Sequence, residues 1–191
     1  MMLWSEWFKA VAHLRPACTR GRTYGWMVLV LMGLSIRGDL AGVTSFVRAL
    51  GLAPAAYQPL LHLFHSSGLQ LDRLTTLWTR WCRDAFPVFT VGAHRVCLTD
   101  GLKAPKEGRQ MPAVKKLHQE SANNSKPSFI FGHSFQCLSL LTRTAGGHAA
   151  AVPLVARICE GVVWSNRDKR TQLDRLVLLF LSVAVALESA V

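Results

Sequence analysis

The chain has 191 residues, half of them hydrophobic, enough for one medium-sized domain or for a small domain plus part of another. Lys and Arg number 22 against 11 Asp and Glu, which gives a net charge of +11 at pH 7. This charge favours a polyanionic partner, either nucleic acid or an acidic membrane surface, and says nothing about the fold. Both halves of the chain carry the basic excess, so this is not a neutral body with a basic tail.

Residues 1–86 have helical periodicity, and we expect a helical amino-terminal region. Pro16, Gly51, Pro54 and Gly68 separate the expected helices. The last of these helices, 69–86, should turn one set of side chains inward (Leu71, Leu74, Leu77, Trp78, Trp81) and another outward (Arg73, Arg80, Arg83). Short helices with outward arginines suit a helix-turn-helix DNA-binding region and equally suit any small helical bundle.

The period changes at Pro87, where we place the start of a second domain, 87–191. We expect a strand at about 93–99, a polar loop over 101–127, and two long strands at 128–143 and 150–161. Gly146 and Gly147 should form the turn between the long strands, and Pro153 indicates an edge or a bulge. An apolar helix should then end near Leu187. The predicted fold class is therefore α+β.

The two apolar runs, 25–36 and 176–187, are about a dozen residues long, whereas ~20 are needed to span a bilayer. We therefore expect two buried helices, no membrane span, and no signal peptide at the amino terminus. Three strands give little cover to a helix as apolar as 176–187. This pattern predicts a mixed domain that is cut short or is completed by a partner.

Metal-binding motifs are weak in this sequence. The five cysteines are widely spaced without a C-x-x-C pair, which disfavours zinc ribbons and fingers, and we interpret them as small buried hydrophobes. His62 and His65 could share a helix face, but no third ligand accompanies them. Asp100 is a different case, because it should end the strand at 93–99 and open a basic loop.

Two interpretations of Asp100 and its loop remain open. The loop could be a solvated turn, with the Asp100 side chain bonded to nearby backbone. Alternatively, Asp100 binds metal beside bases that contact phosphates. The candidate DNA-binding residues of the loop are Lys103, Lys106, Arg109, Lys115 and Lys116. The stretch 165–170 either caps a helix or forms a second DNA-contacting turn through Arg167, Lys169 and Arg170.

Three stretches, "TDGLKAPKEGRQMPAVKKLHQES", "KPSFIFGHSFQCLSLL" and "EGVVWSNRDKRTQLD", resemble the DDE transposases of bacterial insertion sequences. The upstream "GDLAGVTSFVRALGLAPAAYQPLLHLFHSSG" is similar to the helical region before their catalytic core. The resemblance covers about residues 37–180 and is most specific over 100–121. It implies the first strands and helix of an RNase H-like core, in which an Asp, a second Asp and a Glu bind two Mg²⁺ ions and cut and join DNA.

Asp100 matches the first of the three acids, which in this family ends the first strand of the core. The second Asp follows the first core helix and the Glu lies much further on. Four acids of this chain do not occupy those positions: Glu160, Asp168, Asp174 and Glu188. The resemblance therefore implies the amino-terminal portion of a transposase, which we expect not to cleave DNA alone.

The resemblance also implies partners and a location. These are transposon-end DNA, a second copy of the chain or a full-length transposase, and the nucleoid of the bacterial cytoplasm. Two alternatives remain. One is a non-catalytic DNA-binding or regulatory fragment, and the other is a basic protein that associates with membranes through its apolar helices.

Overall fold

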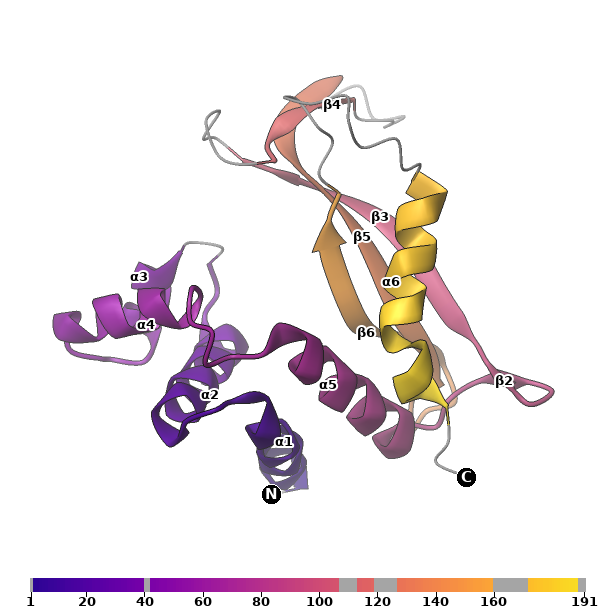
Figure 1. Cartoon of the computed structure of the whole chain (residues 1–191), viewed down its shortest axis with the longest axis horizontal. Coiled ribbons are helices and arrows are strands. Elements are labelled where there is room, and N and C mark those ends of the chain that lie inside the picture. The colour runs from indigo at the N-terminus through magenta and orange to yellow at the C-terminus, as the bar shows by residue number, and fades with distance from the viewer. Residues whose placement is uncertain (1, 40–41, 107–112, 119–126, 160–171, 189–191) are drawn as a thin grey trace. The chain divides into compact units, whose positions relative to one another are not determined.

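The computed structural model describes residues 2–39, 42–106, 113–118, 127–159 and 172–188 (Figure 1). Over these residues the chain is mixed α+β, with six α-helices and two antiparallel sheets, which confirms the predicted class. It divides into two compact units, Met1–Trp81 and Cys82–Val191. The sequence pattern changes at Pro87, whereas the units divide inside the fifth helix.

The first unit is helical. Its elements are α1 Met2–His13, η1 Arg15–Ala17, α2 Gly21–Ile36, α3 Val43–Ala49, η2 Pro54–Ala56, α4 Tyr57–Leu63 and most of α5 Leu71–Ala85. Pro16 and Pro54 each lie in the first turn of a 3₁₀ helix, where their missing N–H costs nothing. Gly51 follows α3 with φ +60°, a conformation that glycine adopts without strain.

Two apolar clusters hold the first unit together. In one, Val30 of α2 packs with Phe46 of α3 and with Leu60 and Leu63 of α4. Gly33 lets the Phe46 ring lie directly on α2, since a Cβ at Gly33 would stand 2.6 Å from the ring. The other cluster joins the end of α1 and η1 to α2 and α5, with Leu14, Cys18 and Met27 buried.

The inward face of α5 differs from its sequence prediction. Leu71, predicted inward, is 55% exposed, whereas Thr79 and Cys82 are fully buried. Arg83, predicted outward, has a side chain that is only 14% exposed. The reason is tertiary, because the Arg83 guanidinium donates hydrogen bonds to the carbonyls of Ala186 and Glu188. Helical periodicity alone could not show that carbonyls at the end of α6 accept hydrogen bonds from Arg83.

The second unit is a sheet with one helix. Its elements are β1 Thr90–Val91, β2 His94–Arg95, β3 Cys97–Pro105, β4 Lys115–His118, β5 Phe129–Arg143, β6 Ala149–Ile158 and α6 Gln172–Leu187. The long strand β5 lies in the middle, with β3 antiparallel along one edge and β6 antiparallel along the other (Figure 1). β4 pairs with the beginning of β5, and β1 and β2 form a separate hairpin.

Two predictions for 93–127 were wrong. The strand expected at 93–99 is broken after β2 and resumes as β3, which runs on to Pro105, and part of the expected loop is strand β4. Gly92, with φ +60°, opens the two-residue turn between β1 and β2. β3 continues past Asp100 because every residue from Cys97 to Pro105 has a pairing partner on β5. Tertiary pairing here overrides the low strand propensity of Gly101 and Lys103.

The hairpin of β5 and β6 matches its prediction. Gly147 adopts φ +81° in the turn, and the Thr144 amide donates to the His148 carbonyl at 2.8 Å. Leu138 pairs with Val155 and Ser139 with Pro153, so Leu154 is one extra residue on β6. This is the bulge that Pro153 predicted, since proline cannot complete a regular ladder.

α6 packs against β5 and β6. Leu138, Leu140 and Thr142 of β5 are buried and share one face of the sheet, whereas the buried His133 lies on the other face. The buried residues of α6 are Leu179, Val183, Ala186 and Leu187. Most of its other apolar side chains are exposed, with Val185 at 75%, and Leu176 and Ala184 are half-buried. In the part of the chain that the structure describes, no helix combines the length and the hydropathy needed to cross a membrane.

Candidate functional site

Asp100 lies in the middle of β3, not at its end, which corrects the sequence prediction. It pairs with Cys137 of β5, and β3 continues for five more residues. The Asp100 side chain is exposed, and its Oδ1 accepts a hydrogen bond from the Gly101 amide at 2.7 Å. This local contact agrees with the first interpretation of Asp100, in which its side chain is bonded to nearby backbone.

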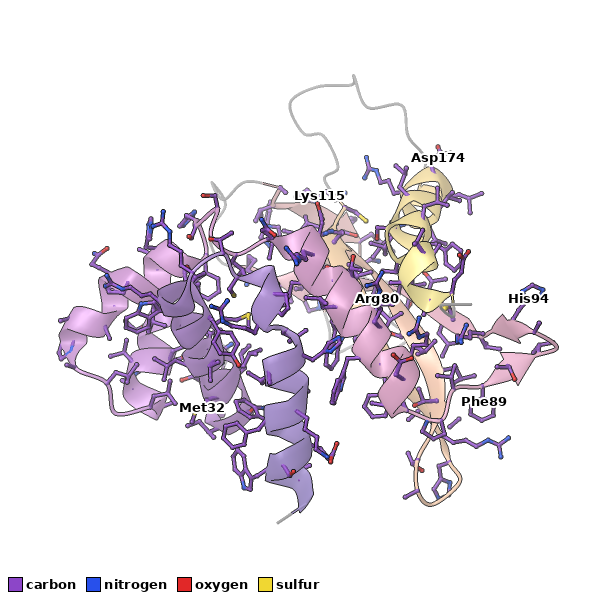
Figure 2. The ribbon with its side chains drawn as sticks, turned by 60° about the horizontal axis from the view of Figure 1, so that its bottom comes forward. Met32, Arg80, Phe89, His94, Lys115 and Asp174 are labelled. Atoms are coloured by element: carbon purple, nitrogen blue, oxygen red, sulfur yellow. The ribbon has the colours of Figure 1, made fainter. Side chains whose placement is uncertain are left out.

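The predicted DNA-binding lysines of the described residues gather at the end of the sheet beyond Asp100. Pro105 and Lys115 both pair with Gly132 of β5, from opposite edges. One residue further, the Lys106 amide donates to the Phe131 carbonyl at 2.8 Å, and Lys116 pairs with Phe131. Lys106, which directly follows β3, Phe131 of β5 and Lys116 of β4 therefore form one row across the sheet. Figure 2 shows Lys115 at this end of the sheet and Phe89 at the other.

The row lies on the same face of the sheet as Asp100. Side chains alternate along a strand, and directly paired residues share a face. Asp100 shares a face with Cys137, and Cys137 and Phe131 are six residues apart on β5, so they also share one. At about 3.3 Å per residue the row is roughly 20 Å along β5 from Asp100. The acid and the bases thus share a face without contact.

Lys115 and Lys103 differ from Lys116 in their surroundings. Lys115 is half-buried and alternates to the face of the buried Leu117, whereas Lys116 is exposed. The Lys103 ammonium donates to the His118 carbonyl at 2.7 Å and so ties β3 to β4. The four lysines come to one end of the sheet, but only Lys106 and Lys116 belong to the row.

Phe129 and Phe131 belong to this surface and were missed by the sequence interpretation. They are 50% and 42% exposed. The Lys116 ammonium lies 4.4 Å from the centroid of the Phe129 ring, and the His118 ring lies 5.0 Å from it. The signal was the alternation in "FIF", which places both rings on one face of a strand. We call Lys106, Lys116, His118, Phe129 and Phe131 the lysine–phenylalanine surface.

The Cys137 thiol is the group most affected by Asp100. Burial raises the pKa of Cys137 above its ordinary value, and the nearby Asp100 carboxylate and Cys159 thiol raise it further. Negative charge beside a thiol disfavours its ionisation. Cys137 therefore ionises less readily, and is less nucleophilic, than an ordinary cysteine thiol.

Metal ligands do not gather around Asp100 within the described ranges, where no group of three or more His, Cys, Asp and Glu side chains could hold an ion. Asp174 lies in the first turn of α6, and Glu188 directly follows that helix. Six other residues of the sequence prediction fall outside the described residues: Arg109, Glu160, Arg167, Asp168, Lys169 and Arg170.

Comparison with known proteins gives no match to any family model, curated protein or solved structure.

Proposed function

We propose that this protein binds duplex DNA through the lysine–phenylalanine surface and is related to the DDE transposases. The observation that carries the proposal is the row Lys106–Phe131–Lys116. Neither ammonium of the row has a carboxylate partner among the residues that the structure describes. With strands about 4.8 Å apart, the two lysines lie roughly 10 Å from each other at the backbone.

Electrostatics supports this assignment. Duplex DNA carries about one negative charge per 1.7 Å of its axis, and a lysine that neutralises a phosphate releases a condensed counterion. The gain in entropy drives binding whatever the base sequence. The net charge of +11 adds long-range attraction, and the exposed rings of Phe129 and Phe131 add apolar contact with sugars or bases.

The relation to DDE transposases draws support from element order. Three antiparallel strands, β3, β5 and β6, are followed by α6. This is the order expected for the beginning of an RNase H-like core, and Asp100 lies on the first of the three strands. Asp100 would supply the first of the three acids of that family.

Mg²⁺ would need more than the described residues supply. Mg²⁺ is bound by one or two carboxylates together with water and phosphate oxygens. Asp100 is one exposed carboxylate, and its Oδ1 already accepts the Gly101 amide. A two-metal site needs further acids, so we assign no cleavage step to the described residues.

The environment of Asp100 favours a second candidate, a non-catalytic DNA-binding chain that competes or pairs with a complete transposase. In this candidate Asp100 stabilises the Gly101 amide and contributes nothing to DNA affinity. A nicking assay with Mg²⁺ and supercoiled DNA tests the expectation that this chain does not cleave DNA alone. DNA binding without nicking agrees with that expectation, and nicking that disappears in Asp100→Asn would contradict it and make Asp100 catalytic.

Fluorescence anisotropy with a labelled duplex tests DNA binding itself. Lys115 and Lys116 provide a matched pair, because they are neighbours of equal charge on opposite faces of β4. Lys116→Gln should weaken binding several-fold more than Lys115→Gln. Absence of binding by the unmodified chain at low ionic strength would contradict the proposal.

A further inference from the structure

A second basic site lies in the first unit, where a cavity of about 680 Å³ opens between the start of α2 and the end of α4. Its charged lining is Arg20 and Arg22, and no Asp or Glu lines it. Neither guanidinium group has a hydrogen bond or an ion pair with any residue in the described ranges. His62 and His65, for which the sequence shows no third metal ligand, both line this cavity.

Hydroxyl groups form the inner wall of the cavity. A Cβ placed on Gly68 would stand 2.9 Å from Thr23 Oγ1, 3.1 Å from Ser66 Oγ and 3.4 Å from Thr19 Oγ1. Three hydroxyl groups therefore lie around Gly68, where the Thr19 hydroxyl donates to the Gly68 carbonyl at 3.4 Å and the Ser66 hydroxyl accepts from the Gly68 amide at 3.1 Å. Hydroxyls, imidazole N–H groups and guanidinium groups are the donors that bind phosphate oxygens.

The wall is held by backbone hydrogen bonds. The Thr19 amide donates to the Gly68 carbonyl at 2.9 Å, and the Gln70 amide donates to the Ala17 carbonyl at 2.9 Å. Cys18 and Leu69 form an antiparallel bridge between these two contacts. Leu63 anchors the other side in the apolar cluster around Val30. The wall that carries the hydroxyl groups is thus positioned before any ligand arrives, which lowers the entropic cost of binding.

We propose that this cavity binds a phosphate group through Arg20 and Arg22. The site is separate from the lysine–phenylalanine surface and does not rest on the function proposed for it. A cavity of this volume accommodates more than a bare phosphate, and Trp26 supplies an apolar wall. The phosphate is therefore part of an ester, either the DNA backbone or a free nucleotide-like compound.

Titration of the whole chain with sodium phosphate, followed by tryptophan fluorescence and by calorimetry, tests the site. Sodium chloride at matched ionic strength is the blank, and Trp26→Phe assigns the optical signal. We expect saturable binding that weakens about tenfold in Arg20→Gln/Arg22→Gln, because charge-assisted hydrogen bonds are lost. Arg73→Gln/Arg80→Gln removes the same charge from exposed positions on α5 and should change the affinity less than twofold.

Gly68→Ala provides a variant without a change of charge, and the added methyl should weaken phosphate binding by pressing on the Thr23 hydroxyl. A heat and fluorescence change equal to that of sodium chloride, or equal losses in the two arginine pairs, would overturn the proposal. Competition identifies the source of the phosphate. Displacement by duplex DNA indicates a backbone phosphate, and displacement by a nucleoside monophosphate alone indicates a small ester. Loss of DNA binding in Lys116→Gln with phosphate binding intact separates this site from the proposed function.

Discussion

Lys106 and Lys116 stand on opposite sides of Phe131, one bonded to its carbonyl at 2.8 Å and the other paired with it across β4 and β5. They are ten residues apart in the chain, and β5 brings them into one row. Part of the stretch between Asp100 and Ser121, which was expected to be a loop, thus forms a surface on strands that pair with β5. Its geometry depends on β5, and the predictions below test that dependence.

Gly132 controls how closely β3 approaches β5. A Cβ at Gly132 would stand 2.2 Å from the Ala104 carbonyl oxygen and 2.9 Å from its carbon, both backbone atoms that cannot rotate away. Gly132→Ala should therefore separate the strands and lower the free energy of unfolding by about 1–3 kcal/mol. Urea denaturation followed by circular dichroism measures this change.

Gly101→Ala is the matched control, since it lies on β3 and its Cβ would have only an ordinary contact of 3.9 Å with the Phe135 carbonyl oxygen. It should alter stability by less than about 0.5 kcal/mol. Equal effects of the two substitutions would show that the close approach at Gly132 is unimportant.

Arg83 and Arg95 cap the end of α6. Arg83 donates to the Ala186 carbonyl at 3.1 Å and Arg95 to the Leu187 carbonyl at 2.6 Å. Cations near a helix carboxyl terminus satisfy free carbonyls and oppose the helix dipole. Arg83→Ala should lower the free energy of unfolding by about 1–2 kcal/mol, and hydrogen exchange should quicken in the last turn of α6. Arg80→Ala, an exposed change three residues earlier, should leave both measurements unaltered.

Because of Cys82, the free energy of unfolding should vary with pH in the alkaline range. The thiol is fully buried, and burial raises the pKa of Cys82 from 9.0 to about 12. The folded chain keeps this proton when the unfolded chain loses it. The contribution to stability is therefore complete below pH 9 and is lost as the pH rises from 9 to 12.

At pH 10 the loss from this one thiol is about 1.4 kcal/mol. In Cys82→Ala the difference in unfolding free energy between pH 8 and pH 10 should shrink by about that amount. Cys82→Ala also loses stability because it leaves a cavity. This loss is the same at both pH values, so it cancels when the two are compared within each protein. An unchanged difference would mean that Cys82 ionises equally in the folded chain.

We expect the charge of Asp100 to affect the pKa of Cys137 and not the affinity of the chain for DNA. Asp100→Asn removes one of the causes that raise the pKa of Cys137, so more thiolate forms at a given pH. Alkylation of Cys137 at pH 8.5, followed by mass spectrometry, should accelerate, while duplex DNA affinity stays within about twofold. A large loss of DNA binding in this variant would place Asp100 in direct contact with the ligand.

Local patterns predicted the helices, the β5–β6 hairpin and the bulge at Pro153, because each depends on periodicity, glycine or proline within a few residues. The extent of β3 could not be predicted, since its residues become strand only by pairing with β5, with partners 27 to 43 residues later. The role of Arg83 was hidden for the same reason, with its partners about a hundred residues away. The lysines were predicted as a set, but their division between two faces depends on the register of β4.

The most direct measurement is the salt dependence of duplex DNA binding by Lys106→Gln/Lys116→Gln. If the row contacts two phosphates, log K should fall less steeply with log salt concentration, the slope shrinking by about 1.8 units relative to the unmodified chain. Arg73→Gln/Arg80→Gln, with the same loss of charge on α5, should keep the original slope. An unchanged slope in the lysine pair with a reduced slope in the arginine pair would contradict the account and place DNA on the helical unit.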